Sequence, residues 1–378
     1  MHHVLLLGAG KIGSAIARLL GETGDYDVLV ADADAASLER LEGFANVATR
    51  TLDCGDADAL AAAMEGRHSV ISALSFRFNP AIARCARENG LSYFDLTEDV
   101  ETTRAVREQA EGAAGGTVFL PQCGLAPGFV SIAAHELTKS FDALDTVRLR
   151  VGALPIFPSN QLRYNLTWST DGLINEYGNP CEAVAGGKRI DVLPLEGLEH
   201  FSLDGVMYEA FNTSGGVGTL GETLAGQVRD LDYKTIRYRG HRDLIAFLMN
   251  DLRLNERREI LKDILEHAVP MTPQDVVLIF CTATGQRDGH LVQVTDARKV
   301  YHGPFRGLDL SAIQLTTAAS ICAVLDLHAT GKLPAGGGFV RQEQVPLADF
   351  LANRFGCCYA TGRENVEEIA EPYVPQAS

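Results

Sequence analysis

Residues 4–13 read Val-Leu-Leu-Leu-Gly-Ala-Gly-Lys-Ile-Gly, and this stretch decides the fold. Four apolar residues predict a buried strand, and Gly8 permits the tight turn that follows it. Gly10 lets the backbone approach a pyrophosphate, and Gly13 lets the next helix, predicted over 12–20, pack close to the strand. Free amide groups at the start of that helix would bind the pyrophosphate. The stretch therefore predicts dinucleotide binding, and the alternative is a glycine-rich turn in an α/β domain without a ligand.

A second apolar run, 28–31, ends at Asp32, nineteen residues after Gly13. A carboxylate at this place accepts hydrogen bonds from the ribose hydroxyls and repels a 2′-phosphate. We therefore expect NAD as the cofactor, with NADP less favoured. Asp53, after the third strand, could touch the adenine or could cap the next helix. The residues expected to contact the cofactor are Gly8, Gly10, Lys11, Ile12, Gly13, Asp32, Asp53, Ala73 and Leu74.

Composition limits the class of protein. The chain has 378 residues, which suggests two domains, and its net charge of −16 argues against nucleic acid or an anionic membrane as a partner. The eight cysteines show no CxxC pair and predict reduced thiols, so we expect a cytoplasmic protein without a signal peptide. The ten histidines show no ligand spacing, and we expect no metal.

The first third of the chain alternates strands and helices. This order predicts a parallel sheet with right-handed crossovers, that is, a doubly wound Rossmann-type α/β fold. The predicted strands are 4–7, 28–31, 47–52, 69–73, 92–96 and 117–120. The predicted helices between them are 12–20, 35–42, 56–65, 79–89 and 100–113.

The pattern changes after Pro127-Gly128. A helix over 129–139 is followed by segments of alternating polarity, which predict an inserted α+β domain with an antiparallel or mixed sheet. Its predicted strands are 145–153, 187–193, 231–238, 275–284 and 290–301, and its helices are 242–250 and 256–267. A long apolar helix over 309–330 should return to the first domain. We therefore divide the chain into a dinucleotide-binding domain (1–124 plus 309–350), a substrate and dimerisation domain (125–308) and a flexible tail (363–378).

Three carboxylates follow the fifth predicted strand, where a ligand of a parallel sheet would lie. Asp95 and Glu98 are candidates to hold a substrate ammonium or to remove a proton from it. Asp99 is interpreted as the cap of the next helix.

A basic stretch in the second domain suggests the other end of a substrate. Arg237 and Arg239 would share one face of a strand and could bind a carboxylate bidentately, or they could form salt bridges. His241 is a candidate acid or base, although a lone histidine in a loop is more often a cap. The glycine-rich turn with Thr213 and Ser214 could bind substrate or be only a turn. Trp168, the single tryptophan, could form a wall of the pocket or pack in the core.

These motifs together resemble the saccharopine dehydrogenase-like family, and within it the lysine 6-dehydrogenases. The resemblance covers most of residues 1–350. The segments that carry it are Gly8-Ala9-Gly10-Lys11-Ile12-Gly13, Gly124-Leu125-Ala126-Pro127-Gly128, Asn165 to Gly172, Phe211-Asn212-Thr213-Ser214-Gly215-Gly216 and Tyr233-Lys234-Thr235-Ile236-Arg237-Tyr238-Arg239-Gly240-His241. Fungal saccharopine reductases commonly carry an acid where this chain has Ala126, which favours the lysine 6-dehydrogenase pattern.

The resemblance implies NAD(P)-linked oxidation at the amine-bearing carbon of a lysine-type amino acid by a homodimer. The hypothesis for the mechanism places the substrate ammonium near Asp95 and Glu98, with Glu98 or His241 as the base. Arg237, Arg239 and the Thr213-Ser214 turn would hold the α-carboxylate. Two alternatives stay open. One is a saccharopine or carboxy-polyamine dehydrogenase that acts on a secondary amine, and the other is an NAD-binding sensor without catalysis.

Overall fold

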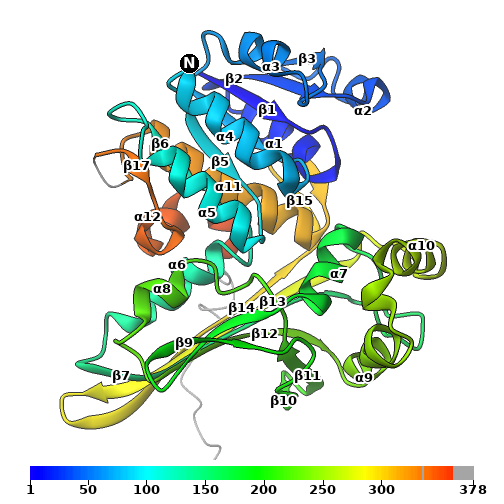
Figure 1. Ribbon diagram of the computed structural model, residues 1–378, viewed down its shortest axis with the longest axis vertical. Helices are drawn as coiled ribbons and strands as arrows, with labels where there is room; N and C mark the ends of the chain where they lie inside the picture. The colour runs from blue at the N-terminus through cyan, green and yellow to red at the C-terminus, as the bar shows by residue number, and fades with distance from the viewer. Residues whose placement is uncertain (334–335, 361–378) are drawn as a thin grey trace, which may run out of the picture.

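The computed structural model describes residues 1–333 and 336–360, and the predicted tail at 363–378 lies outside them. Two sheets stand one above the other, each with its own helices (Figure 1). The predicted α/β class, a doubly wound parallel sheet with a second mixed-sheet unit, is confirmed.

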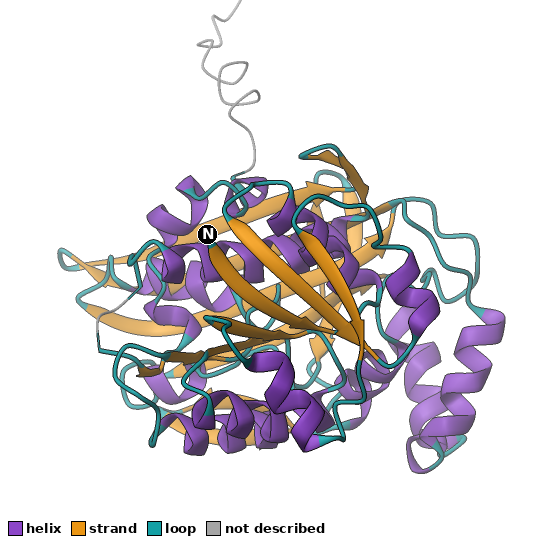
Figure 2. Ribbon diagram, turned by 90° about the horizontal axis from the view of Figure 1, so that it is seen from above, coloured by secondary structure: helices purple, strands orange, loops and turns teal. Residues whose placement is uncertain are grey.

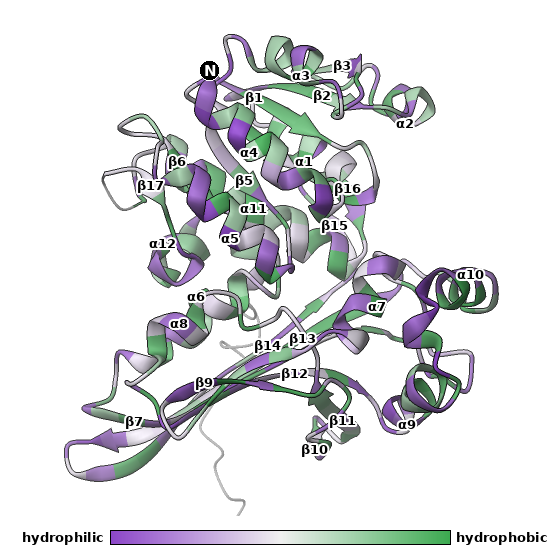
Figure 3. Ribbon diagram, in the orientation of Figure 1, coloured by the Kyte–Doolittle hydropathy of each residue, from purple (hydrophilic) through white to green (hydrophobic). Residues whose placement is uncertain are grey.

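The first sheet has the order β17-β6-β5-β4-β1-β2-β3, and all its neighbours are parallel. Its strands are β1 (His2–Leu7), β2 (Tyr26–Asp32), β3 (Val47–Thr51), β4 (Ser69–Ser72), β5 (Ser92–Asp95), β6 (Val118–Leu120) and β17 (Gly338–Phe339). The central strands are buried on both faces, which explains their unbroken apolar runs (Figure 3).

Helices flank this sheet, as the view from above shows (Figure 2). They are α1 (Lys11–Gly21), α2 (Ala35–Glu39), α3 (Ala57–Met64), α4 (Asn79–Glu88), α5 (Val100–Ala110), α11 (Ala312–Ala329) and α12 (Leu347–Ala352). Asp34, Asp56 and Asp99 cap the helices that follow them by accepting hydrogen bonds from backbone N–H groups. Asp99 is thus the cap that its position predicted.

Helix α11 lies against α1, so the chain returns to the first sheet as predicted. Among the described helices, α11 alone is long and apolar enough to cross a membrane, and 78% of it is buried inside the protein. The helix starts three residues later than predicted, because the short β15 (Gly303–Phe305) and β16 (Leu308–Leu310) pair before it. The division into domains at 124 and 309 stays a prediction.

The second sheet is mixed. Its main path runs β10-β11-β12-β7-β13-β14, in which β12 and β7 are parallel and the other neighbours are antiparallel. Its strands are β7 (Ala143–Pro155), β8 (Cys181–Ala185), β9 (Lys188–Val192), β10 (Glu199–Leu203), β11 (Val206–Asn212), β12 (Asp230–Tyr238), β13 (Asp275–Arg287) and β14 (His290–Tyr301). Its helices are α6 (Phe129–Thr138), α7 (Thr170–Gly178), α8 (Leu220–Leu224), α9 (His241–Ala246) and α10 (Arg258–Ala268).

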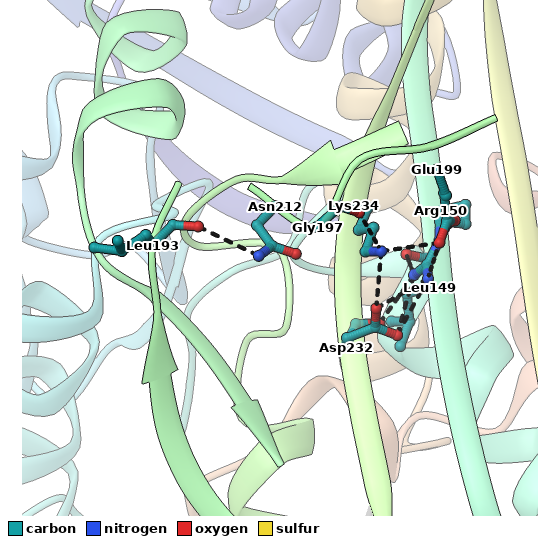
Figure 4. Close-up of polar contacts among 8 residues, drawn as sticks. All are labelled: Leu149, Arg150, Leu193, Gly197, Glu199, Asn212, Asp232 and Lys234. Carbon is teal, nitrogen blue, oxygen red and sulfur yellow. Dashed lines mark hydrogen bonds and ion pairs between the residues drawn. The ribbon is translucent and has the colours of Figure 1, made fainter. Parts of the chain in front are cut away.

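An ion-pair cluster lies on the sheet face that carries the even-numbered residues of β12 and links β10 to β7 and β12. Glu199 of β10 pairs there with the buried Arg150 of β7 and with Lys234 of β12, and Arg150 also pairs with Asp232 (Figure 4). Side chains alternate along a strand, so Tyr233, Thr235 and Arg237 point to the opposite face. The ion-pair cluster therefore leaves Arg237 on the other side of the sheet, where the site lies.

Candidate functional site

A cavity of about 780 Å³ lies between the two sheets, at the carboxyl ends of the parallel strands. The glycine turn and the loops after β4, β5 and β6 form its walls on the side of the first sheet. Strand β12 and helix α7 form the wall on the side of the second sheet. This is the place where an open parallel sheet binds its ligand.

The glycine turn fits a dinucleotide. Gly8 has a φ of +105°, and a Cβ on Gly13 would lie 1.9 Å from the carbonyl oxygen of Gly8, so both glycines are needed for the packing. A Cβ on Gly10 would meet nothing within 4 Å, which leaves open space above the backbone for a pyrophosphate. No side chain caps α1, so its first N–H groups are free to bind an anion.

Most of the predicted cofactor contacts border this cavity. The lining residues among them are Gly10, Lys11, Ile12, Gly13, Ala73 and Leu74. Asp32 lies at the end of β2, where its two oxygens accept hydrogen bonds from the backbone N–H of Ala9 at 2.7 Å and of Asp34 at 2.9 Å. Asp53 is exposed and accepts a bond from Gly55 N, outside the cavity lining, so its adenine contact stays a prediction.

The structure does not place Asp95 at a substrate. Its side chain is fully buried and does not line the cavity. It accepts hydrogen bonds from the Tyr93 hydroxyl, Thr97 N and Gln122 N at 2.7 to 2.9 Å. Burial raises the pKa of this carboxyl, because the charged form loses its hydration. Asp95 thus ties together the loops after β5 and β6, which both border the cavity, and the prediction that it contacts substrate is corrected.

Glu98 does line the cavity, next to Leu96 and Thr97 on the loop after β5. Burial, with a smaller contribution from the negative charges of Asp99 and Asp95, raises the pKa of Glu98 to about 7. A carboxyl with this pKa exchanges its proton near neutral pH, as a general base must.

Arg237 of β12 and Glu176 of α7 form a buried pair on the opposite wall. Their side chains are 3% and 13% exposed, and Arg237 Nη2 lies 3.6 Å from Glu176 Oε2. Burial, offset in part by Arg237, raises the pKa of Glu176 to about 7. The sequence analysis predicted Arg237 and missed Glu176. Helix α7 was not predicted, although the sequence carries a signal for it in Ser169, which caps it by accepting a bond from Gly172 N.

His241 does not line the cavity and instead supports Arg237 from behind. Arg237 Nε donates to the Tyr177 hydroxyl at 2.9 Å. The Tyr177 hydroxyl and His241 Nε2 are 2.9 Å apart, and His241 Nδ1 lies 2.9 Å from Leu162 O. Burial and the charge of Arg237 lower the pKa of His241 to about 3, so the ring is neutral at pH 7. The donor pattern then requires Nδ1–H to donate to Leu162 O, and the Tyr177 hydroxyl to donate to Nε2. The predicted catalytic role of His241 is corrected to this contact.

Three predicted substrate contacts lie outside the cavity lining. Strand β12 ends at Tyr238, so Arg239 is exposed and does not share a face with Arg237 in the sheet. The Thr213 hydroxyl lies 2.7 Å from that of Thr235. Ser214 donates its N–H to Glu176 O and its hydroxyl to Asn175 O, at 3.0 and 3.1 Å, so these residues fix the walls rather than face the cavity.

Trp168 lines the cavity, partly buried, at the turn before α7. A Cβ on Gly172 would lie 2.3 Å from the indole ring, so the ring packs directly on the helix backbone. The single tryptophan therefore forms a wall of the site, which is one of the two interpretations that the sequence allowed.

The charges of the described lining residues are unequal. Four are acidic and two are basic: Glu98, Asp171, Glu176 and Glu266 against Lys11 and Arg237. Lys11 opens α1 at the glycine turn and is exposed, with its Nζ 3.4 Å from Met271 Sδ. Arg237 is thus the buried cation on the wall opposite the glycine turn, and the cavity favours a ligand with more positive than negative groups.

Comparison with known proteins gave matches over nearly the whole described chain. Residues 4–120 match the family model described as the saccharopine dehydrogenase NADP binding domain, and residues 124–355 match that of the saccharopine dehydrogenase C-terminal domain.

Two curated relatives match about half of the chain. The mitochondrial alpha-aminoadipic semialdehyde synthase of Mus musculus is 24% identical over 196 residues, which cover 50% of this chain and 21% of that protein. The saccharopine dehydrogenase [NADP(+), L-glutamate-forming] of Saccharomyces cerevisiae is 26% identical over 203 residues, which cover 52% and 45%. The matched region is therefore less than half of either relative's own length.

Two solved structures share the fold. The apo saccharopine dehydrogenase (L-Glu forming) of Saccharomyces cerevisiae aligns with a TM-score of 0.74 at 17% identity, over 93% of this chain and 96% of that one. The homospermidine synthase of Legionella pneumophila, in complex with NAD, aligns with a TM-score of 0.69 at 14% identity, over 95% and 89%.

Proposed function

The chain belongs to the saccharopine dehydrogenase family, as the resemblance implied, and we propose that it is an NAD-dependent oxidoreductase for a lysine-type amino acid. In this proposal the enzyme oxidises the carbon that bears the side-chain amine. Water then releases ammonium and leaves the semialdehyde, which cyclises with its own α-amine.

The balance of buried charges is the observation that carries the proposal. When both carboxyls are ionised, Glu98, Glu176 and Arg237 supply two negative groups and one positive group. A lysine-type zwitterion carries two ammonium groups and one carboxylate, which is the complementary set. Buried charges are favourable only when they are paired, so this match decides which ligand the cavity accepts at low cost.

The coenzyme would lie on the amide groups of the glycine turn, with its ribose at Asp32 and its nicotinamide half along Ala73 and Leu74. When bound, it accepts a hydride from the amine-bearing carbon. Glu98 stands on the same side of the cavity, and we assign it as the base that removes the ammonium proton beforehand. Arg237 holds the carboxylate and so fixes the reacting carbon, and such positioning can contribute roughly 7–11 kcal/mol to barrier lowering.

The alternative substrates fit the charges less well. Saccharopine carries three carboxylates, and Arg237 is the buried cation that faces them among the described lining residues. A polyamine without a carboxylate, such as the Legionella relative's name implies, would leave Arg237 unused. A carboxylated polyamine is the second candidate, because Asp171 and Glu266 add acidic groups to the lining that a longer amine could reach.

The test is a panel of substrates with both coenzymes. Lysine, saccharopine, a carboxylated polyamine and ornithine are each mixed with NAD or NADP, and the absorbance of the reduced nicotinamide is followed. We expect reduction with lysine and NAD, and ammonium release in equal amount. Reduction with saccharopine alone would overturn the proposal, and tight NAD binding without reduction by any substrate would favour a sensor.

A further inference from the structure

We propose that Glu176 binds the α-ammonium group of the substrate and is the residue that selects a free α-amino acid. This inference deepens the proposed function and rests on it. Arg237 and Glu176 would then read the carboxylate and the ammonium of the same head group, and the reacting amine at the other end of the substrate would lie at Glu98.

The pair is placed for a shared ligand rather than for each other. At 3.6 Å, Arg237 Nη2 and Glu176 Oε2 are close enough to attract but too far apart for a hydrogen bond. Arg237 Nε donates a hydrogen bond to the Tyr177 hydroxyl at 2.9 Å, and Arg237 Nη1 donates one to Ile236 O at 3.0 Å. Its Nη2 donates no hydrogen bond to the described residues, and Arg237 lines the cavity together with Glu176.

A third polar group at the same wall is also unused. Thr167 lines the cavity and is 6% exposed, and its hydroxyl, which neighbours the Tyr164 hydroxyl, makes no hydrogen bond of good geometry within the described residues. A buried hydroxyl without a hydrogen-bond partner costs free energy. A bound ligand that forms a hydrogen bond with the Thr167 hydroxyl would remove this cost. Glu176, Arg237 and Thr167 together offer an acceptor, a donor and a hydroxyl to one polar head group.

The two glutamates stand on either side of one turn. Ser214 N donates to the carbonyl oxygen of Glu176 at 3.0 Å, and a Cβ on Gly215 would lie 3.0 Å from the Cβ of Glu98. Glu98 comes from the first sheet, where the coenzyme would bind, whereas Glu176 comes from the second. The ammonium at Glu98 is therefore the one beside the nicotinamide, and the ammonium at Glu176 is the one left for recognition.

Three ligands of nearly equal length separate these contacts. They are lysine, 6-aminohexanoate, which lacks the α-amine, and 1,5-diaminopentane, which lacks the carboxylate. Affinities are measured by calorimetry without coenzyme, and Trp168 fluorescence reports binding at the cavity itself. We expect the wild type to bind lysine at least about 10-fold more tightly than either analogue, since each analogue leaves one buried charged group of the protein without its hydrogen-bond partner.

Each of two variants should lose the preference for lysine over one analogue and keep the preference for lysine over the other. Glu176→Gln should bring the affinities of lysine and 6-aminohexanoate together, while 1,5-diaminopentane stays weak. Arg237→Gln should bring lysine and 1,5-diaminopentane together. Asp243→Asn is the control: Asp243 of α9 is an exposed carboxylate of the second domain that does not line the cavity and accepts a hydrogen bond from Arg242 Nη1 at 2.9 Å, so the order of the ligands should not change.

The result that overturns the inference is a Glu176→Gln variant that still rejects 6-aminohexanoate as strongly as the wild type. If lysine is oxidised and this discrimination is unchanged, the proposed function stands and Glu176 has another role. If the ligands are discriminated as expected but NAD is not reduced, the recognition site stands and the proposed reaction is wrong.

Discussion

The Tyr177 hydroxyl accepts a hydrogen bond from Arg237 Nε at 2.9 Å, and the two residues also stack, with the guanidinium carbon 5.7 Å from the ring centroid. The same hydroxyl reaches His241 Nε2. Since Arg237 is the cation proposed to hold the substrate carboxylate, Tyr177 and His241 determine where that cation points.

Tyr177→Phe keeps the ring and removes the hydroxyl. We expect the KM for lysine to rise roughly 10-fold or more, because a buried donor and a buried acceptor each lose a partner worth about 1–3 kcal/mol. The kcat should change less than the KM, since Glu98 and the coenzyme site are not touched. Steady-state kinetics with varied lysine at saturating NAD give both constants.

Tyr164→Phe is the control for this variant. The Tyr164 ring lies over the same guanidinium, whose carbon is 5.0 Å from the ring centroid, but the Tyr164 hydroxyl makes no hydrogen bond to Arg237 or His241. The KM and the stability of this variant should match those of the wild type. Equal effects of the two substitutions would contradict the positioning role of the Tyr177 hydroxyl.

Glu98 leads to a prediction on the pH dependence. A base must be ionised, and burial raises the pKa of this carboxyl to about 7, so kcat/KM for lysine should fall as the pH drops below about 7. Glu98→Gln should lose most of the kcat and should still bind NAD. Glu176 has a similar pKa, but it is proposed to bind the α-ammonium group and not to remove a proton. Glu176→Gln should therefore affect the KM more than the kcat. A Glu98→Gln variant with wild-type kcat would contradict the assignment.

The sequence predicted the features that are local in the chain. The glycine turn, the parallel strands and the acidic loop with Glu98 follow from neighbouring residues, and they are where the patterns place them. Glu176 could not be found this way, because it becomes part of the site only when α7 packs against β12, which lies about sixty residues further along the chain. Arg239 shows the opposite error. The sequence analysis extended the alternation of the strand to this residue and so placed it at the site, whereas β12 ends at Tyr238 and Arg239 is exposed.

Buried carboxylates show why residue type alone does not assign a role. Asp95 and Glu98 are three residues apart at the end of one strand, and the sequence treats them alike. The structure gives Asp95 three donors from the fold, whereas Glu98 borders the cavity. Two of these donors, Tyr93 and Thr97, are two residues from Asp95, and the third, Gln122, comes from the loop after β6 and has no signal in the local pattern.

A stability prediction concerns Asp275 of β13. Its buried carboxylate accepts the backbone N–H groups of Ala312 and Ile313, and so caps α11 from the other sheet. Asp275→Asn turns one oxygen into a donor that faces an N–H group, and it removes a charge that favours the helix N-terminus. We expect the free energy of unfolding to fall by about 1–3 kcal/mol.

Urea unfolding measures this change, and Ser311→Ala provides a comparison. Ser311 caps the same helix through Gln314 N without a charge, and its loss should cost about 1 kcal/mol. If Asp275→Asn is no less stable than the wild type, the carboxylate does not hold the helix.

Asp32 carries the prediction for the coenzyme. It lies where the ribose would bind, and a 2′-phosphate there would meet like charge, so we expect the wild type to prefer NAD. In Asp32→Asn the ratio of kcat/KM for NADP over NAD should rise about 10-fold, since one like-charge contact costs about 1–4 kcal/mol between water and a protein surface. Asp34→Asn is the control, because the Asp34 carboxylate is exposed and caps α2 through Ala36 N and the Ser37 hydroxyl. A wild type that prefers NADP would show that the Asp32 oxygens serve the N–H groups of Ala9 and Asp34 and not the ribose, and the choice of coenzyme would then depend on other residues.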